Sequence, residues 1–246
     1  MREPRIGLGL MCKPPRPGAT KTRLARSIGD DAAARLSCAF LTDCARAAGD
    51  AAQCAGLDMV AFYRPADAVE ELGAILGPRW ELVHADAGNL GATLHEALTV
   101  LLARCPDGAL LMGADVPLIG SATIAAAARI LSDGGTRDVA LVPSPDGGYC
   151  LIGVRCAQAA APLFAPMAWG GPQVLAQTLR RAAAHRLKTR LLAPVRDIDD
   201  GDDLAWLRAE LKTRPDDAPA TRAALGELDR VRSRGCTGFT PPADHG

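Results

Sequence analysis

Short apolar runs alternate with segments of helical periodicity over most of the chain. The run Ile6–Met11 predicts a buried strand, and the stretch Asp30–Ala48 places Leu36, Phe40 and Cys44 on one helical face. Further strands are predicted at Leu57–Phe62, Glu81–Ala85, Ala109–Met112, Val139–Val142, Tyr149–Val154 and Arg190–Leu192, and further helices at Asp67–Leu76, Ala92–Ala103, Thr123–Leu131, Pro172–Ala184 and Asp203–Leu211. This alternation is typical of an α/β fold with a largely parallel central sheet and helices on both of its faces.

The alternating pattern ends near residue 212. A cluster of helix breakers begins at Pro215, a helix is compatible with Thr221–Arg232, and Gly235–Gly246 is rich in glycine and proline. Chain ends of this kind are often poorly ordered. We therefore expect one domain over residues 1–212 and a loosely ordered tail over residues 213–246.

The composition of the 246-residue chain fits a globular protein, since 48% of its residues are hydrophobic. Lysine plus arginine and aspartate plus glutamate both number 28, so the net charge is zero. Proteins that bind nucleic acid or membrane surfaces usually have a basic excess, so neither partner is expected. No apolar run approaches the roughly 20 residues that span a bilayer, and the eight cysteines form no C-x-x-C pair. We therefore expect a cytoplasmic protein with reduced thiols.

A proline-rich basic loop follows the first predicted strand. The segment Lys13–Leu24 reads KPPRPGATKTRL and contains four cations. A helix that begins after such a loop offers unpaired N–H groups to phosphate, and lysine and arginine add charge-assisted bonds. A solvated loop that merely precedes a helix is the alternative. The predicted phosphate-binding residues are Lys13, Arg16, Gly18, Lys21 and Arg23.

The basic loop is not a Walker A motif. That motif requires G-x-x-x-x-G-K-[ST], and Thr20 stands where its second glycine belongs. Pro14, Pro15 and Pro17 also lack the N–H groups that would wrap around a phosphate. An ATPase of the P-loop type is therefore not expected.

Carboxylates follow several predicted strands. Asp115 comes directly after a strand that we expect to be central, where it could hold Mg²⁺ beside substrate phosphates or cap the next helix or turn. Asp146 lies in a glycine-rich turn that a simple hairpin would also explain. Asp197 and Asp199 alternate along an extended segment, so their like charges share one face and favour a cation between them.

Taken in order, these segments resemble the DUF2064 family of glycosyltransferase-like proteins, whose members are often labelled arsenosugar-biosynthesis or radical-SAM/selenodomain-associated transferases. The family signature reads K-x-P-x-P-G-x-x-K-T-R-L, G-x-D-x-P, D-G-G-Y-x-L-I-G, W-G-x-P-x-V and D-[IV]-D-x-x-x-D-L. The matching segments are Lys13–Leu24, Gly113–Pro117, Asp146–Gly153, Trp169–Val174 and Asp197–Leu204. The resemblance implies the GT-A fold of nucleotide-diphospho-sugar transferases, which molybdenum-cofactor and phospholactate guanylyltransferases share.

The resemblance also implies roles for individual residues. The cations of the basic loop would hold nucleotide phosphates, and Asp115 would hold a divalent metal, Mg²⁺ or Mn²⁺. A second metal ligand maps onto Asp199, with Asp197 beside it. The sugar or acceptor side would be lined by Gly147, Gly148, Tyr149 and Trp169.

One segment departs from the family pattern. Where members carry a G-D-L-G-[ED]-R-M-like stretch, this chain has Gly88–Leu94, which lacks the acid and the arginine. A non-catalytic nucleotide-binding protein is therefore a third hypothesis beside the two enzymatic ones.

The favoured hypothesis is a metal-dependent glycosyltransferase with a nucleotide-sugar donor and a small-molecule acceptor. Asp115 and Asp146 are the predicted catalytic residues, and Asp197 is a further candidate for the general base. The alternative is a guanylyltransferase-like nucleotidyltransferase, in which a phosphorylated small molecule attacks a nucleoside triphosphate and pyrophosphate leaves. A protein without any ligand would leave every charged cluster as solvated surface, although such clusters at strand ends usually mark sites.

Overall fold

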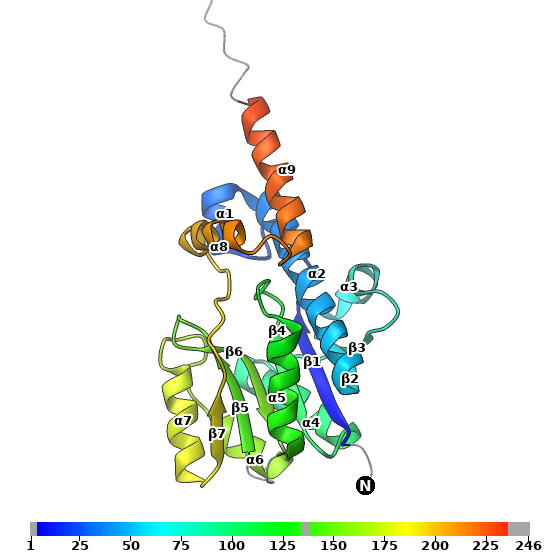
Figure 1. Ribbon diagram of the computed structural model, residues 1–246, viewed down its shortest axis with the longest axis vertical. Helices are drawn as coiled ribbons and strands as arrows, with labels where there is room; N and C mark the ends of the chain where they lie inside the picture. Colours follow the sequence, from blue (N-terminus) through cyan, green and yellow to red (C-terminus); the bar gives the residue numbers. More distant parts are fainter. Residues whose placement is uncertain (1–3, 134–137, 236–246) are drawn as a thin grey trace, which may run out of the picture.

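A seven-stranded sheet lies at the centre of the computed structural model, which describes residues 4–133 and 138–235 (Figure 1). The strand order is β3-β2-β1-β4-β6-β5-β7. β6 runs antiparallel to its neighbours β4 and β5, and the other pairs are parallel. The strands are β1 (Ile6–Cys12), β2 (Leu57–Tyr63), β3 (Glu81–His84), β4 (Ala109–Gly113), β5 (Asp138–Pro143), β6 (Tyr149–Val154) and β7 (Lys188–Leu191). The predicted α/β class with a mostly parallel sheet is confirmed.

Helices connect most of the strands. They are α1 (Thr22–Ile28), α2 (Asp30–Ala55), α3 (Val69–Leu76), α4 (Leu90–Arg104), α5 (Ser121–Asp133), α6 (Ala157–Leu163), α7 (Val174–Ala184), α8 (Gly201–Thr213) and α9 (Pro219–Gly235). The pattern did not predict α6, a short helix that contains Pro162. No helix in the described ranges combines the length and the apolar character needed to span a bilayer.

The two faces of the sheet have separate apolar layers. Along β1, Ile6, Leu8 and Leu10 alternate onto the face that α2 and α5 cover, because successive side chains of a strand point to opposite sides. The opposite face is covered by α4, α6 and α7. There a Cβ added to Gly9 would lie only 3.0 Å from the Leu101 side chain, so the glycine lets α4 approach the strand closely.

A third apolar cluster lies beyond the carboxyl end of the sheet, at the top of Figure 1. It joins α1, the start of α2, α8 and α9. Asp43 of α2 is almost fully buried and accepts hydrogen bonds from the N–H groups of Ala220 (3.1 Å) and Thr221 (2.8 Å), which fixes the first turn of α9. The predicted loose tail therefore contains a packed helix in its described part, while residues 236–246 lie outside the described ranges.

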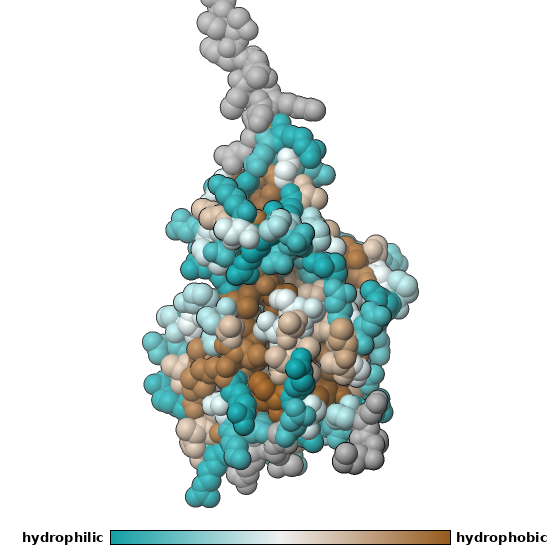
Figure 2. Space-filling model, viewed as in Figure 1, coloured by the Kyte–Doolittle hydropathy of each residue, from teal (hydrophilic) through white to brown (hydrophobic). Residues whose placement is uncertain are grey.

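The surface of this helical cluster is polar. Figure 2 shows hydrophilic residues around α8 and α9 and more hydrophobic ones lower in the view, between α7 and α5. The helices of the cluster thus bury their apolar sides against one another, with Phe40, Leu207 and Leu225 among the buried residues.

The order in which the chain adds strands to the sheet reverses between the parallel neighbours β1 and β4. From β1 the chain proceeds to β2 and β3 on one side, and it returns on the other side at β4. Ligands of open α/β sheets bind at the carboxyl ends of the strands at such a point. Here the basic loop after β1 and the segment Gly113–Pro117 after β4 flank that position.

Candidate functional site

Two cavities open at the carboxyl end of the sheet and share one wall. The larger has a volume of about 490 Å³ and lies above β1, β2 and the basic loop. The smaller has a volume of about 310 Å³ and lies between β4, β6 and the loop that precedes α7. Asp115 and Asp199 line both cavities, so the two spaces meet at these carboxylates.

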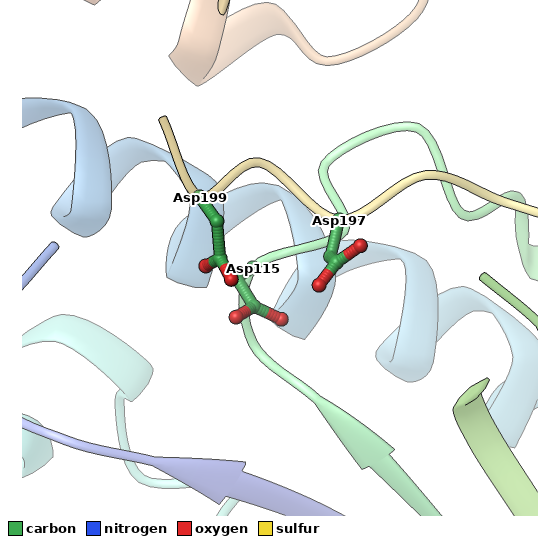
Figure 3. Close-up of side chains that lie close together, drawn as sticks. All are labelled: Asp115, Asp197 and Asp199. Atoms are coloured by element: carbon green, nitrogen blue, oxygen red, sulfur yellow. The ribbon is translucent and has the colours of Figure 1, made fainter. Parts of the chain in front are cut away.

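Three aspartates converge at this junction (Figure 3). One carboxylate oxygen from each of Asp115, Asp197 and Asp199 lies within 4.8 Å of the others. Asp115 follows β4, whereas the other two belong to the extended segment between β7 and α8. The backbone N–H of Ile198 donates to the Asp115 carbonyl oxygen at 3.0 Å, and its buried side chain holds the segment in the helical cluster. The alternation predicted for this segment therefore places both acids beside Asp115.

Asp197 differs from its neighbours in its surroundings. Burial raises the pKa of its carboxyl to about 6, and the nearby charges of Asp115, Asp146 and Asp199 act in the same direction. The hydroxyl of Ser144 donates to Asp197 Oδ1 at 2.6 Å and opposes the increase in pKa. Around pH 6 a proton and a cation therefore compete for this carboxylate.

Lys21 provides the positive charge at the junction. Its Nζ lies 2.8 Å from Asp115 Oδ2 and 2.6 Å from Asp199 Oδ1, and its side chain is only 10% exposed. Burial lowers the pKa of Lys21, but the two carboxylates outweigh that effect and raise it overall. The residue has a left-handed backbone conformation (φ 51°) and immediately precedes α1. The three converging carboxylates, two of which pair with this ammonium group, form a hard oxygen donor set that suits Mg²⁺ or Mn²⁺.

The cations of the basic loop are divided by the fold. Lys13, Lys21 and Arg23 line the larger cavity. Arg16 does not line it and instead pairs with Asp67 (3.0 Å) and Glu71 (2.9 Å) beside α3. Gly18 also lies outside the wall and serves the turn, where its φ of 73° suits a residue without a Cβ.

The larger cavity contains one further cation that the sequence patterns did not indicate. Arg64 follows β2, lines the cavity and lies 3.6 Å from Asp86 Oδ1. Burial lowers the pKa of Lys13, and the positive charge of Arg64 lowers it further. A rule that considers every charged residue within two positions after a predicted strand would have found Arg64, because parallel strands end at the same edge.

The glycine-rich turn after β5 forms part of the smaller cavity. Asp146, Gly148 and Tyr149 line it, and the Asp146 carboxylate accepts a hydrogen bond from the Gly148 N–H at 2.9 Å. Burial raises the pKa of the Tyr149 phenol to about 12. Gly147 is not in the wall but holds the turn against the start of α7, since its carbonyl oxygen accepts a hydrogen bond from the Leu175 N–H at 2.9 Å.

Trp169 forms an aromatic wall of the smaller cavity. Its ring stacks on Phe164 with centroids 5.5 Å apart, and Phe164 in turn stacks on His95 at 5.9 Å. A Cβ at Gly91 would lie 1.9 Å from the Trp169 Nε1 atom, so this position admits only glycine while Trp169 stays in place. In the same segment, Asn89 caps α4 through its side-chain oxygen. The unusual stretch Gly88–Leu94 is therefore part of the cavity architecture.

Replacing Gly147 by alanine is expected to destabilise the protein by about 2 kcal/mol or more. The residue has a φ of 92°, and an added Cβ would lie 2.1 Å from the Pro172 carbonyl oxygen, which is backbone and must move. Gly56→Ala is the matched control, because its φ is 63° and nothing lies within 4 Å of the added Cβ. Urea denaturation measures the free energy of unfolding of both variants. Equal losses of stability in the two variants would show that the Pro172 backbone moves away from the added Cβ with no loss of stability.

The comparison with solved structures supports the fold assignment. A provisionally named nucleotide-diphospho-sugar transferase of Desulfovibrio desulfuricans G20 superimposes with a TM-score of 0.82 at 29% identity, covering 95% of this chain and 98% of that one. A nucleotidyl transferase of Methanothermobacter thermautotroptrophicus superimposes with a TM-score of 0.57 at 16% identity, covering 85% and 98% of the two chains, which shows a shared fold alone.

Sequence comparison finds both a relative and a family. The phosphoenolpyruvate guanylyltransferase of Roseiflexus sp. (strain RS-1) is 35% identical over 144 residues, which span 56% of this chain and 60% of that protein. The family model described as an uncharacterized protein conserved in bacteria, DUF2064, matches residues 45–171, more than half of the chain. The fold, the matched segments and this coverage agree that the protein belongs to the DUF2064 family.

Proposed function

We propose that the protein is a metal-dependent glycosyltransferase that uses a nucleotide-sugar donor, with residues 1–212 as its single catalytic domain. The observation that carries the proposal is the position of Asp115, Asp197 and Asp199 at the junction of a basic and an acidic cavity. A donor bound in the larger cavity and an acceptor bound in the smaller one would meet at these carboxylates. The nucleotide-diphospho-sugar transferase-like fold supports this arrangement.

The donor phosphates are assigned to the cations of the larger cavity. Ammonium and guanidinium groups form charge-assisted hydrogen bonds with phosphate oxygens, and here they occupy one wall. Arg16 and Gly18 are assigned to the shape of the loop rather than to direct contact. The proposed phosphate-binding residues are Lys13, Lys21, Arg23 and Arg64.

The three junction aspartates are the proposed metal ligands. Mg²⁺ or Mn²⁺ bound there would supply Lewis-acid stabilisation of the charge on the leaving diphosphate. Lys21 contributes a fixed positive charge at the same place, held by Asp115 and Asp199. This preorganised charge stabilises the departing phosphate oxygen without reorientation during the reaction.

The transfer step uses the acidic side chains of the smaller cavity. An acceptor hydroxyl forms the new C–O bond at the anomeric carbon while the bond from that carbon to the diphosphate breaks. The electron pair leaves with the nucleoside diphosphate, and a carboxylate oxygen of Asp146, the acidic side chain of this cavity that is not a proposed metal ligand, takes the hydroxyl proton. Gly148, Tyr149 and Trp169 line the space in which the acceptor would lie.

A nucleotidyltransferase is the second candidate, favoured by the 35% identity to a protein named as a phosphoenolpyruvate guanylyltransferase. In that reaction a nucleoside triphosphate occupies the larger cavity and a phosphorylated acceptor attacks its α-phosphate. The two reactions release different products, because nucleotidyl transfer yields pyrophosphate and sugar transfer yields a nucleoside diphosphate.

A thermal-shift panel tests both candidates. Nucleoside triphosphates and nucleotide-sugars are added to the full chain, each with Mn²⁺, Mg²⁺ or EDTA. A ligand at a hundred times its dissociation constant adds about 2.7 kcal/mol of stability, which is a readily measured shift in melting temperature. We expect a metal-dependent shift that is largest with a nucleotide-sugar. The absence of a shift with every nucleotide would contradict the proposed function.

A further inference from the structure

The smaller cavity carries acidic side chains and no basic ones in its described lining. Its four carboxylates belong to Asp115, Asp146, Asp197 and Asp199. The larger cavity shares Asp115 and Asp199, but its wall also contains lysines and arginines. The uncharged part of the smaller wall is largely apolar and includes Leu94, Leu111, Ile152, Trp169 and Val174.

Two arginines near this cavity make contacts elsewhere. Arg181, on α7, donates to the carbonyl oxygens of Ala165 (2.6 Å) and Pro166 (2.8 Å). Arg196 donates to Asp203 Oδ1 at 2.9 Å. These hydrogen bonds tie both guanidinium groups to the scaffold, so neither is presented to a ligand in the smaller cavity.

The charge balance of the smaller cavity disfavours an anionic ligand. Lys21 neutralises part of the negative charge from the far side of Asp115 and Asp199. Even with one divalent cation counted as well, the four carboxylates leave a net negative charge, and a bound donor would add its phosphates. A phosphate or carboxylate group on the acceptor would therefore meet like charge at short range, which strongly opposes binding.

The aromatic wall favours a ligand with an apolar face. Trp169 is held by its stack on Phe164 and by close contact over Gly91, so its ring is fixed before a ligand arrives. A fixed aromatic ring gives a large contact area with little loss of conformational entropy. The C–H face of a sugar ring or another small cyclic alcohol matches such a wall.

We propose that the smaller cavity takes an acceptor alcohol without phosphate or carboxylate groups, uncharged or positively charged, with an apolar face against Trp169. The inference rests on the proposed function, because it treats the larger cavity as the nucleotide site. It sets this chain apart from a guanylyltransferase that acts on phosphoenolpyruvate, whose acceptor carries both a phosphate and a carboxylate.

Matched pairs of compounds test the charge preference. The full chain is saturated with Mn²⁺ and with the nucleotide that gives the largest thermal shift. Calorimetry then compares glucose with glucose 6-phosphate, glycerol with glycerol 3-phosphate, and a panel of uncharged cyclic polyols with phosphoenolpyruvate. We expect the unphosphorylated member of a pair to bind at least about tenfold more tightly. Released nucleoside diphosphate and pyrophosphate are measured in the same samples.

A charge-neutralising variant gives the test a second readout. Asp146→Asn keeps the shape of the side chain and its hydrogen bond from Gly148 N–H while removing one negative charge. We expect the discrimination against glucose 6-phosphate and phosphoenolpyruvate to fall by about threefold or more in this variant. Asp50→Asn, on α2 and outside both cavities, is the matched control and should leave discrimination unchanged.

The outcomes separate this inference from the proposed function. Tighter binding of a phosphorylated member, pyrophosphate release with phosphoenolpyruvate, or no binding of any uncharged polyol to the nucleotide-loaded protein would overturn the inference. A failure of the proposed function would appear earlier, as the absence of any nucleotide-dependent thermal shift. In that case the same pairs are compared on the protein with Mn²⁺ alone, and the same preference is expected.

Discussion

Replacing Asp115 by asparagine is expected to reduce turnover at least about a thousandfold, equivalent to about 4 kcal/mol of transition-state stabilisation. Asp115 is the carboxylate that both cavities share, and it contributes to the oxygen cluster and to the ion pair with Lys21. Asparagine has nearly the same shape, so the fold should be preserved. Turnover is measured as the rate of product formation, and Mn²⁺ binding is measured by calorimetry. Turnover and Mn²⁺ binding should both be lost in the variant.

Two controls make the Asp115 result specific. Asp50→Asn removes an exposed carboxylate of α2 that pairs with Arg46, and it should behave as the wild type. The circular dichroism spectrum and the melting temperature of Asp115→Asn without metal establish whether the variant is folded. Wild-type turnover in a folded Asp115→Asn protein would refute the metal assignment.

Replacing Lys21 by methionine is expected to raise the affinity for Mn²⁺ and to lower turnover. Without nucleotide, Mn²⁺ should bind about tenfold or more tightly, because the ammonium group that now occupies Asp115 and Asp199 is removed and one positive charge is lost nearby. With nucleotide present, turnover should fall about a hundredfold or more, because a fixed positive charge at the phosphates is missing. Methionine retains the length of the apolar stem.

Calorimetry with Mn²⁺ alone measures the first effect of Lys21→Met, and the rate of product formation with nucleotide and Mn²⁺ measures the second. Lys188→Met at the start of β7 is the control. That lysine is exposed, and β7 is an edge strand that is separated from β1 and β2, the strands below the larger cavity, by β4, β6 and β5. Unchanged affinity for Mn²⁺ together with unchanged turnover would show that Lys21 only closes an ion pair.

Local sequence patterns predicted the class of the fold but not its packing at the carboxyl end of the sheet. Strand and helix periodicity depend on neighbours along the chain, which is why β1, β2 and β4 were predicted within a residue or two. The antiparallel direction of β6 follows from the tight turn at Gly147 and Gly148, which is too short for a crossover between parallel strands. The position of α9 depends on Asp43, a residue far away in the sequence.

The candidate site was also predicted only in part. The position of Asp115 after a strand, the alternation of Asp197 and Asp199, and the cations between Lys13 and Arg23 are all properties of short segments. Those segments do not show that Lys21 pairs with two of these acids. Nor do they show that Arg16 forms ion pairs with Asp67 and Glu71 instead of lining the cavity.

The sequence by itself determined the order of the strands and of most helices, the charged residues at strand ends and the family to which the chain belongs. The tertiary structure alone decided that three aspartates meet where two cavities join, and that one cavity is basic while the other is acidic. The physical reason is the distance along the sequence over which each effect acts. Periodicity and turn chemistry depend on residues a few positions apart. Whether a charge is neutralised or exposed depends on distant segments that the strand order brings beside it.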